Sequence, residues 1–366
     1  MKTILFAGGG TGGHLYPGLA IARALVKLDP EVRPYFIGAK RGIERDVLPQ
    51  SGFAFELLDL YPLYRSHPWE NWKTLRGAFS AWRAIADRAN SEKPALVVGT
   101  GGYASGLALA YAATHRIPIV IQEQNTFPGI TTRFFSRYAS QIHLGFPEAR
   151  LHLKSAKAAH IYGSGNPIEP PPADARDKTK GRAAWEFPTD HGVVLLVYGG
   201  SQGSQALNAA VADWVRRGIP GELYIIWATG RANYDALASL ESERVKVRPY
   251  LSPVADAYRA ADIALSRAGA MATAELCAWG LPMILVPLPT AAADHQTANA
   301  RALSEAGAAE VIVQQLLSVD SIARAVSVLT TSPEMLAERS GKALERARPA
   351  AAENIAKMIL ELVHLK

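Results

Sequence analysis

Three glycine-rich segments have the residue types that bind phosphate groups. They span residues 8–14 (Gly-Gly-Gly-Thr-Gly-Gly-His), 99–106 (Gly-Thr-Gly-Gly-Tyr-Ala-Ser-Gly) and 199–204 (Gly-Gly-Ser-Gln-Gly-Ser). Glycines let a backbone approach a phosphate closely, and the N-terminus of a following helix supplies N–H groups and partial positive charge. One such loop is often only a tight turn. Three of them, distributed over both halves of the chain, predict two phosphate-bearing ligands or one ligand shared by both halves.

The first segment also satisfies the dinucleotide-binding pattern G-x-G-x-x-G, through Gly8, Gly10 and Gly13. The match is weak, because five glycines in six positions fit many patterns. The pattern further requires an acidic residue near the end of the second strand, and residues 37–41 (Ile-Gly-Ala-Lys-Arg) contain none. Arg41 could instead bind the extra phosphate of NADP, so an NADP-dependent oxidoreductase remains an alternative.

A fourth segment, residues 266–275 (Ser-Arg-Ala-Gly-Ala-Met-Ala-Thr-Ala-Glu), combines small residues with two charged ones. Small residues at the end of a strand allow a ligand to come close, and an arginine there can neutralise a diphosphate. Arg267 is that arginine. Glu275, in the early turns of the predicted helix, could accept both hydroxyl groups of a ribose. Equally, Glu275 could only favour the helix dipole, with Arg267 exposed to water.

These segments lie where strands end in a regular alternation of strands and helices. Continuous apolar runs separated by helical patterns are typical of a parallel sheet covered by helices on both faces. In the first half we predict strands at residues 3–7, 32–37, 53–58, 95–98, 117–121 and 141–144. In the second half we predict strands at residues 193–198, 223–228, 245–248, 262–265, 283–287 and 310–313. The predicted fold is therefore α/β, with two tandem Rossmann-like, doubly wound domains facing a cleft.

The alternation is interrupted between residues 167 and 192, where three consecutive prolines and mixed charges show little periodicity. Such a composition is typical of a domain joint. The length of 366 residues also fits about two domains. We expect an N-terminal domain over residues 1–165 and a C-terminal domain over residues 166–349. The final helix, residues 350–366, could pack back on the first domain.

The composition bears on several classes of protein. Hydrophobic residues make up 49% and charged residues 20%, which is ordinary for a folded chain and excludes a disordered or collagen-like one. The net charge of +6 is weak evidence for nucleic acid and fits a phosphorylated substrate or an anionic membrane surface equally well. We expect no nucleic-acid partner. The single cysteine, Cys277, excludes a disulfide framework and predicts a reducing cytoplasm. No apolar stretch reaches the roughly 18 residues of a membrane span.

Six motifs, taken in order, resemble those of one family. They are Gly-Gly-Thr-Gly-Gly-His at residues 9–14, Gly101-Gly102-Tyr103, Glu123-Gln124-Asn125, Gly165-Asn166-Pro167, Gly-Gly-Ser-Gln-Gly at residues 199–203, and Arg267-Ala268-Gly269-Ala270. The family is that of the peptidoglycan-precursor N-acetylglucosaminyltransferases, the MurG family, which has the two-Rossmann GT-B fold. Each motif is modestly specific, but six in this order, over nearly the whole chain, are highly specific.

The resemblance implies transfer of N-acetylglucosamine, with inversion, from UDP-N-acetylglucosamine to a lipid-linked muramyl-pentapeptide. This step of peptidoglycan synthesis takes place on the cytoplasmic face of the cell membrane. The resemblance also implies that the N-terminal domain binds the lipid acceptor and the C-terminal domain binds the UDP-sugar. Carried onto this sequence, Thr11, Gly12, Gly13 and Asn125 would contact the donor from across the cleft.

The resemblance places the remaining donor contacts in the second half of the chain. Ser201 would bind the diphosphate, Leu251 would lie against the uracil through its backbone, and Gln296 would bind sugar hydroxyls. Glu275 would accept the ribose hydroxyls. The segment that lines the sugar and the ribose consists of Ala270, Met271, Ala272, Thr273, Ala274 and Glu275.

The chain departs from the family pattern after the Gly-Asn-Pro turn. The family usually has an arginine there, close to the uridine, whereas here Ile168 is followed by Glu169. This puts the contact with the nucleoside, and the tightness of UDP binding, in question. The segment Asp294-His295-Gln296 also varies within the family, so His295 is the alternative to Gln296 as the sugar contact.

Inverting transfer in a single displacement needs a base for the acceptor hydroxyl and stabilisation of the departing UDP. His14 is our candidate base, because an unperturbed imidazole has a pKa of about 6.5 and exchanges protons near neutral pH. Glu123 is the second candidate, and His14 could also only cap the helix or orient a phosphate. Arg267 and the helix start at residues 199–204 would stabilise the leaving diphosphate. No Asp-x-Asp pair stands at a strand end, so we expect no metal and no cofactor.

Apolar and aromatic residues recur three or four positions apart between residues 69 and 82, and basic residues interleave with them. The apolar members are Trp69, Trp72, Leu75, Phe79 and Trp82, and the basic ones are Lys73, Arg76, Arg83 and Arg88. Such a stripe is usually a helix face packed on its own core. Because the resemblance implies a lipid-linked acceptor, we weigh that reading against peripheral docking on an anionic bilayer surface.

Other enzymes of the same two-domain class remain alternatives. A UDP-N-acetylglucosamine epimerase or a glycolipid synthase would share the loops and the donor, so only analysis of the product would separate them. A protein that only binds would retain donor affinity and turn nothing over.

Overall fold

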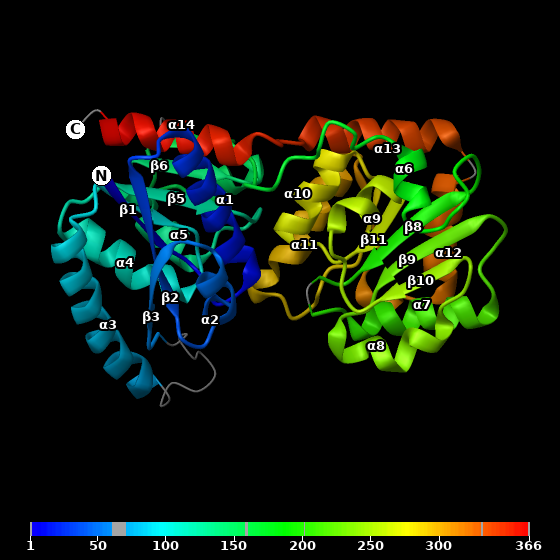
Figure 1. The fold of residues 1–366 in the computed structure, drawn as a ribbon, viewed down its shortest axis with the longest axis horizontal. Helices are drawn as coiled ribbons and strands as arrows, with labels where there is room; N and C mark the ends of the chain where they lie inside the picture. Colours follow the sequence, from blue (N-terminus) through cyan, green and yellow to red (C-terminus); the bar gives the residue numbers. More distant parts are fainter. Residues whose placement is uncertain (1, 61–70, 158–159, 201, 331, 365–366) are drawn as a thin grey trace. The chain divides into compact units, whose positions relative to one another are not determined.

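The computed structural model describes residues 2–60, 71–157, 160–200, 202–330 and 332–364, with the side chains of residues 71–76 outside that description. The chain divides into two compact units, each built around its own sheet (Figure 1). The first unit comprises residues 1–169 and 348–366, and the second comprises residues 170–347.

The first unit contains a parallel sheet in the order β3-β2-β1-β4-β5-β6-β7. Its strands are β1 (Lys2–Ala7), β2 (Val32–Ala39), β3 (Ala54–Leu58), β4 (Leu96–Gly99), β5 (Ile119–Glu123), β6 (Gln141–Leu144) and β7 (Ile161–Tyr162). The order reverses between β1 and β4, and doubly wound sheets bind ligands beyond the carboxyl ends of the strands at such a point. Ala7 pairs with Gly99 across these two strands, so the first two glycine segments start side by side.

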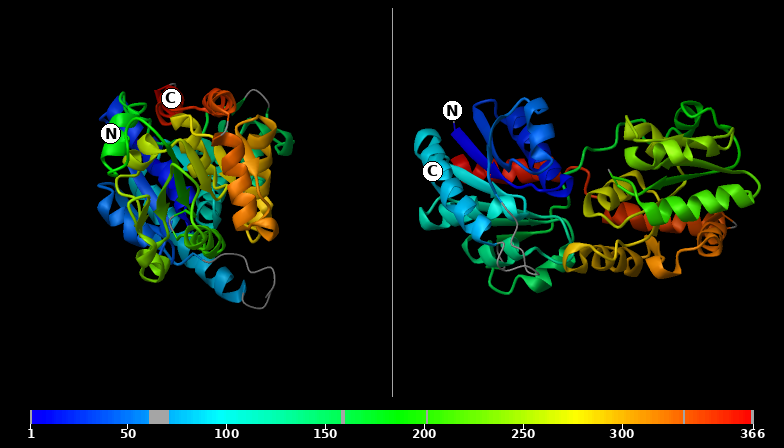
Figure 2. Two further views of the ribbon diagram at one scale, coloured as in Figure 1. Left: turned by 90° about the vertical axis from the view of Figure 1, so that its right-hand side faces the viewer. Right: turned by 90° about the horizontal axis from the view of Figure 1, so that it is seen from below.

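Helices cover both faces of this sheet (Figure 2). They are α1 (Gly12–Leu28), α2 (Glu44–Val47), α3 (Asn71–Glu92), α4 (Tyr103–Thr114), α5 (Ile130–Phe135) and α14 (Ala351–His364), with 3-10 turns η1 (Leu48–Gln50), η3 (Ser136–Tyr138) and η4 (Pro147–His152). Buried side chains of α1 and α14 pack on one face of the sheet, and those of α3 and α4 pack on the other.

The C-terminal helix α14 belongs to the first unit, although it is separated from the rest of that unit in sequence. Ile355 and Ile359 are completely buried and share a core cluster with Leu15 and Leu19 of α1. Lys2 Nζ donates a hydrogen bond to the carbonyl of Val363 over 2.8 Å. The end of the chain therefore completes the hydrophobic core of the first unit.

The second unit contains a parallel sheet in the order β10-β9-β8-β11-β12-β13. Its strands are β8 (Val193–Tyr198), β9 (Leu223–Ala228), β10 (Val245–Arg248), β11 (Ile263–Ser266), β12 (Met283–Leu285) and β13 (Ala309–Val311). The order reverses between β8 and β11, where Tyr198 pairs with Ser266. The glycine segment at residues 199–204 and the segment at residues 266–275 therefore begin next to each other.

Helices also cover the sheet of the second unit. The helices of this unit are α6 (Lys178–Ala183), α7 (Gln205–Arg217), α8 (Arg231–Leu237), α9 (Val254–Ala260), α10 (Ala270–Trp279), α11 (His295–Glu305), α12 (Val319–Thr330) and α13 (Pro333–Arg346), with 3-10 turns η6 (Ala238–Leu240), η7 (Ala292–Asp294) and η8 (Gln314–Leu316). The apolar sides of α7 and α12 pack on one face of the sheet around the completely buried Trp227.

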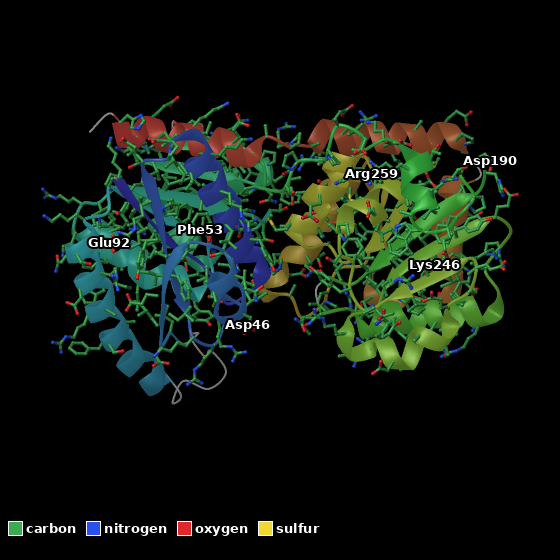
Figure 3. The ribbon with its side chains drawn as sticks, in the orientation of Figure 1. Asp46, Phe53, Glu92, Asp190, Lys246 and Arg259 are labelled. Atoms are coloured by element: carbon green, nitrogen blue, oxygen red, sulfur yellow. The ribbon has the colours of Figure 1, made fainter. Side chains whose placement is uncertain are left out.

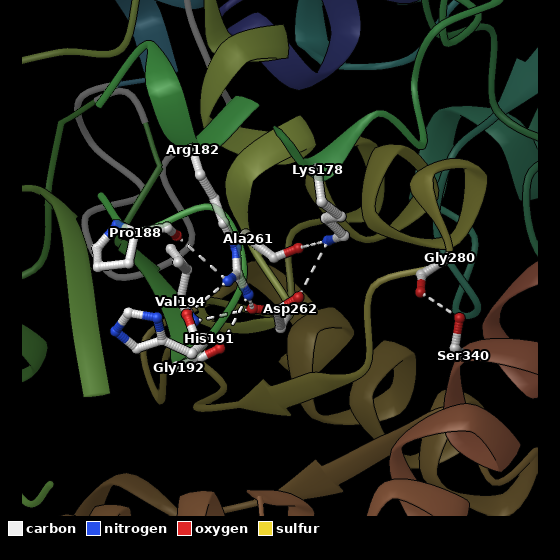
Figure 4. A network of polar contacts seen from close by, with 10 residues as sticks. All are labelled: Lys178, Arg182, Pro188, His191, Gly192, Val194, Ala261, Asp262, Gly280 and Ser340. Atoms are coloured by element: carbon white, nitrogen blue, oxygen red, sulfur yellow. Dashed lines mark hydrogen bonds and ion pairs between the residues drawn. The ribbon is translucent and has the colours of Figure 1, made fainter. Parts of the chain in front are cut away.

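A network of charges attaches α6 to the amino ends of two strands of the second unit (Figure 4). Asp262, just before β11, pairs with Arg182 over 2.8 Å and with Lys178 over 3.4 Å. The same carboxylate accepts the N–H of Val194 at the start of β8. Arg259, labelled in Figure 3, pairs with Asp174 over 3.1 Å. Ion pairs therefore help to hold the proline-rich segment on the second unit, together with the buried ring of Phe187, which packs against Tyr224 of β9 at 5.1 Å.

The predicted fold class, two tandem doubly wound α/β domains, is confirmed by the two parallel sheets. Four strands, at residues 141–144, 193–198, 223–228 and 245–248, have the predicted bounds, and the bounds of the other predicted strands differ by one or two residues. For example, β5 begins at Ile119 rather than at residue 117, because Pro118 has no N–H to donate. The sequence did not predict β7, because a two-residue strand carries too little pattern to recognise.

Candidate functional site

The first two glycine segments pack directly against each other at the carboxyl edge of the first sheet. A Cβ atom on Gly8 would overlap the hydroxyl of Thr100, and one on Gly102 would overlap the carbonyl of Gly9. Gly102 also has φ +73, a conformation that favours glycine. Part of the glycine content therefore serves this close packing of two loops, in addition to any approach by a ligand.

The two loops together hold His14. Its Nδ1 lies 2.9 Å from Oγ1 of Thr11, and its backbone carbonyl accepts a hydrogen bond of 2.7 Å from the hydroxyl of Thr100. A Cβ on Gly101 would lie 2.7 Å from Cδ2 of the imidazole, so the ring rests on the second loop. Gly12 and Gly13 form the first turn of α1 immediately before it. The imidazole is thus fixed at a helix N-terminus, where it can exchange a proton or donate to an anion.

Beneath the first loop lies Glu44, which the sequence did not single out. Its side chain is completely buried, and Oε1 accepts the N–H of Gly10 over 2.8 Å and that of Ala39 over 3.2 Å. A Cβ on Gly9 or on Gly42 would overlap the carboxyl group. The glycines around Glu44 were the only signal of this arrangement in the sequence, and glycines alone do not indicate which side chain packs against them.

Glu123, the second candidate base, is buried at the end of β5 and surrounded by donors. Oε1 accepts the N–H of Asn125 over 3.1 Å, and Oε2 accepts the N–H of Gly129 over 3.0 Å. Burial raises the pKa of this carboxyl above its ordinary value, while the hydroxyl of Thr132 and these N–H groups act against the rise. The carboxyl group closes the turn over residues 124–129 and also draws in the side-chain amide of Asn125, at 3.4 Å.

Buried amides connect this turn with the Gly-Asn-Pro motif. Nε2 of Gln122 donates to Oδ1 of Asn166 over 3.1 Å, and Nδ2 of Asn166 donates to the carbonyl of Gln124 over 3.1 Å. Gln124 in turn donates to the carbonyl of Thr100 over 2.8 Å. The Glu-Gln-Asn and Gly-Asn-Pro motifs are therefore linked to the second glycine loop through side-chain amides.

In the second unit, the glycine segment after β8 leads into α7. Ser204 caps this helix, its hydroxyl accepting the N–H of Leu207 over 3.4 Å. A Cβ on Gly203 would overlap the carbonyl of Thr229, so this loop also packs tightly on its neighbour. Ser201, predicted to bind the diphosphate, lies outside the described residues. The N–H groups at the start of α7 are suited to an anion.

Arg267 is largely buried, and its guanidinium is engaged within the chain. Nη1 donates to the carbonyls of Val286 and Pro287 over 3.1 and 3.2 Å, and Nη2 donates to Oε1 of Gln314 over 2.7 Å. Burial lowers the pKa of the guanidinium from its ordinary value. These contacts fix the turn between β11 and α10 to the end of β12. A direct contact of Arg267 with a diphosphate stays a prediction.

The small residues predicted to line the sugar and the ribose form the first turns of α10. Ala270 and Thr273 are buried, and the other predicted members, Met271, Ala272 and Ala274, are partly accessible. The carboxyl group of Glu275 accepts a hydrogen bond of 2.6 Å from the hydroxyl of Tyr258 on α9. Sequence reasoning missed Tyr258, because it lies in another helix with no motif around it.

The other residues predicted to contact the donor are Gln296, with His295 as its alternative, and Leu251. Oε1 of Gln296 accepts the N–H of Leu288 over 3.0 Å. In the same helix α11, Asn299 donates to the carbonyl of Ala268 over 3.1 Å, which ties α11 to the turn before α10. His295 is held instead by the carbonyl of Ala292, 2.6 Å from Nδ1. Leu251 is buried in the segment after β10.

The amphipathic stripe divides into exposed and packed members. Phe79 is 67% exposed, with the guanidinium of Arg83 6.0 Å from its ring centroid, whereas Trp82 packs edge-on against Tyr111 at 5.5 Å. Arg88 is paired with Glu56. Trp69 and the side chains of Trp72, Leu75, Lys73 and Arg76 lie outside the described residues.

A second exposed apolar group, on α5 and η3, was not predicted. Ile130, Phe134 and Tyr138 are each about half exposed, and the guanidinium of Arg137 lies 5.2 Å from the Phe134 ring centroid.

Helices of the described residues are all too short or too polar to cross a membrane. In the same residues there is no cluster of three or more acidic, histidine or cysteine side chains that could hold a metal ion.

Comparison with known proteins places both units in one family. The model of the glycosyltransferase family 28 N-terminal domain matches residues 4–144, and that of the C-terminal domain matches residues 194–355. Two curated relatives carry the name UDP-N-acetylglucosamine–N-acetylmuramyl-(pentapeptide) pyrophosphoryl-undecaprenol N-acetylglucosamine transferase. The relative from Prosthecochloris aestuarii is 37% identical over 99% of this chain and 100% of its own length. That from Salinibacter ruber is 38% identical over 98% of this chain and 96% of its own.

A solved structure agrees with these relatives. The crystal structure of MurG from Acinetobacter baumannii is 27% identical, covers 99% of this chain and 100% of its own, and superimposes with a TM-score of 0.76. The chain therefore belongs to glycosyltransferase family 28, and within it to the peptidoglycan-precursor N-acetylglucosaminyltransferases, the MurG family that its six motifs predicted.

Proposed function

We propose that this protein transfers N-acetylglucosamine from UDP-N-acetylglucosamine to a lipid-linked muramyl-pentapeptide in peptidoglycan synthesis. The observation that carries the proposal is full-length identity of 37% with a relative named for this reaction. The local geometry agrees with it, because the ends of β1, β4, β8 and β11 present the loops that a nucleotide-sugar transfer requires.

The donor is assigned to the second unit. The start of α7, with Ser201, would bind the diphosphate, and Glu275 would accept the ribose hydroxyls. Leu251 would lie against the uracil, and Gln296 would bind sugar hydroxyls through its amide. The first turn of α10 would line the sugar. This assignment of the donor is supported by two hydrogen bonds: the one from Leu288 to Gln296, and the one from Asn299 to Ala268 in the turn before α10.

Arg267 would act on the leaving diphosphate through the field of its buried positive charge. Its three hydrogen bonds to Val286, Pro287 and Gln314 hold that charge at the C-terminal end of β11. Such a preorganised charge stabilises developing negative charge without reorganisation during the reaction. The N–H groups at the start of α7 would supply the direct contacts.

His14 is the better supported base of the two candidates. Its imidazole is oriented by Thr11, whose Oγ1 lies 2.9 Å from Nδ1, and an imidazole exchanges protons near neutral pH. Both carboxyl oxygens of Glu123 already accept hydrogen bonds from the turn that follows it. We assign Glu123 to holding that turn, with Asn125 positioned by it.

The transfer would proceed in one displacement. His14 takes the proton of the acceptor hydroxyl while that oxygen forms a bond to C1 of N-acetylglucosamine. The bond from C1 to the diphosphate oxygen breaks, and UDP leaves with the electron pair. Because attack and departure occur on opposite sides of C1, the configuration of the sugar is inverted.

We also propose that the first unit docks peripherally on the cytoplasmic face of an anionic membrane. Phe79 and Phe134 support this, since each is exposed beside an arginine, Arg83 or Arg137. Aromatic side chains with neighbouring cations are typical of bilayer interfaces with anionic lipid. The lipid-linked acceptor would then be reached at the surface where it resides.

The function is tested by transfer of radiolabel from UDP-N-acetylglucosamine into a synthetic lipid acceptor. We expect label in the lipid fraction, and much less with UDP-glucose or UDP-N-acetylgalactosamine. Conversion of the free donor to its 2-epimer without transfer would support the epimerase alternative. Oxidation of NADPH would support an oxidoreductase, and donor binding without any product would support a binding protein. Each of these three results would contradict the proposal.

A further inference from the structure

We propose that Tyr258 is a positioning residue that orients the carboxyl group of Glu275 and thereby determines how strictly the site selects a ribonucleotide donor. The inference rests on the proposed function, in which Glu275 accepts the hydroxyls of the donor ribose. Tyr258 acts through Glu275 and is not itself assigned a contact with the donor.

The contact joins two different helices. Tyr258 lies in α9, and Glu275 lies in the second turn of α10. The hydroxyl of Tyr258 donates to Oε2 of Glu275 over 2.6 Å. This distance is in the range of a charge-assisted O–H···O⁻ hydrogen bond, which is about twice as strong as a neutral one.

The phenol cannot easily move away from this contact. Tyr258 is 3% exposed, and its ring centroid lies 6.4 Å from that of Tyr198 and 5.6 Å from that of Trp279. The two tyrosine hydroxyls are 3.4 Å apart. Burial raises the pKa of Tyr258 well above its ordinary value, with nearby Tyr198 and Glu275 acting in the same direction. Tyr258 therefore stays protonated and remains a hydrogen-bond donor.

An oriented carboxylate matters for ribose recognition. To accept two neighbouring hydroxyls, the plane of the carboxyl group must face both of them, and a glutamate without a fixed partner loses rotamer entropy when it does so. The hydrogen bond from Tyr258 already restricts the rotamers of Glu275 in the unliganded protein, so that binding of the donor costs less side-chain entropy. Sites that hydrogen-bond a substrate hydroxyl reject the analogue that lacks it, because the buried group is then left unpaired.

The test compares UDP-N-acetylglucosamine with its 2′-deoxyuridine analogue in wild type, Tyr258→Phe and Tyr198→Phe. Phenylalanine keeps the ring and its aromatic contacts and removes only the hydroxyl. For wild type we expect kcat/KM to favour the ribose donor by at least about a hundredfold. In Tyr258→Phe that preference falls about tenfold, through a higher KM for the ribose donor, with the deoxy donor little changed.

Tyr198→Phe is the matched control, because it removes the neighbouring buried hydroxyl, 3.4 Å from that of Tyr258, and keeps the hydrogen bond from Tyr258 to Glu275. It should keep most of the wild-type preference. In a Glu275→Ala background, Tyr258→Phe should change the preference no further, since the group it positions is gone.

An unchanged preference in Tyr258→Phe, or an equal change in Tyr198→Phe, would overturn the inference while leaving the proposed function intact. A wild-type protein that does not use UDP-N-acetylglucosamine would overturn the proposed function itself. A wild type that transfers the sugar from both donors equally would remove Glu275 from the ribose, and the inference with it.

Discussion

At the scale of single residues, replacement of His14 tests the chemistry most sharply. We expect His14→Ala to lower kcat by at least about a hundredfold, the low end for loss of general-base catalysis, while the Kd for UDP-N-acetylglucosamine changes little. Steady-state kinetics and donor titration measure the two effects. His115→Ala, an exposed histidine at the end of α4, is the control and should keep wild-type turnover. Undiminished turnover in His14→Ala would remove it from the role of base.

A second residue-scale prediction concerns His143, which is completely buried in β6. Burial lowers the pKa of this imidazole to about 4, and its nitrogens meet Ser164 and Gln141. At pH values between the pKa of this imidazole in the folded chain and its pKa of about 6.5 in the unfolded chain, the unfolded chain binds a proton that the folded chain does not. The free energy of unfolding therefore falls as the pH drops through this window.

From pH 7 to pH 5 we expect His143 to account for a loss of about 2 kcal/mol in the stability of the first unit. Urea unfolding at the two pH values measures it. His143→Gln removes the titrating group and keeps polar atoms, so its stability should depend less on pH over this range. An equal pH dependence in the two proteins would show that His143 titrates normally in the folded state.

At the scale of elements, the first glycine loop depends on a side chain from another element. Glu44→Ala would leave the N–H groups of Gly10 and Ala39 without their acceptor, which costs about 1–3 kcal/mol for a buried group such as that of Ala39. Because this loop leads to the Thr11–His14 pair, we expect kcat to fall as well. Glu44→Gln keeps an acceptor oxygen and should recover most of the activity.

Kinetics and thermal unfolding of both variants check this prediction. Wild-type turnover in Glu44→Ala would show that the loop holds its conformation without the carboxylate. Equal losses in the alanine and glutamine variants would assign the effect to the charge of Glu44 rather than to the hydrogen bonds.

Helices α3 and α5 carry the prediction for membrane docking. The double variant Phe79→Ser/Phe134→Ser should bind anionic vesicles at least about tenfold more weakly, since burial of one phenylalanine contributes about 1.5–3 kcal/mol. Co-sedimentation with vesicles measures the binding, and Leu316→Ser, an exposed apolar residue of the second unit, is the control. Equal binding by wild type and the double variant would exclude these two side chains from the docking surface.

At the scale of the whole molecule, periodicity was sufficient to predict both sheets and most of their strands. Alternating apolar strands and helices determine a doubly wound sheet, and glycine segments mark the ends of strands where it can bind ligands. The contacts that orient the site were not predictable in this way. Glu44 reaches Gly10 across 34 residues, and Tyr258 reaches Glu275 across 17, with no periodic signal for either pair.

Burial also determines contacts of the candidate site residues that the sequence does not show. The sequence shows Arg267 beside a glycine and so suggests a contact with phosphate. The structure gives its guanidinium three acceptors on Val286, Pro287 and Gln314, which only the fold brings together. Likewise Glu123 has the residue type of a base, but the turn after β5 supplies donors to both of its oxygens.

In the proposed reaction the sugar passes from the donor to the acceptor in one inverting step. NMR spectroscopy of the product formed from UDP-N-acetylglucosamine, an α-linked donor, and a synthetic lipid acceptor distinguishes this step from its alternatives. We predict one new glycosidic bond in the β configuration and one UDP released for each sugar transferred. An α-linked product, or UDP release without a disaccharide, would rule out single-step inverting transfer by this protein.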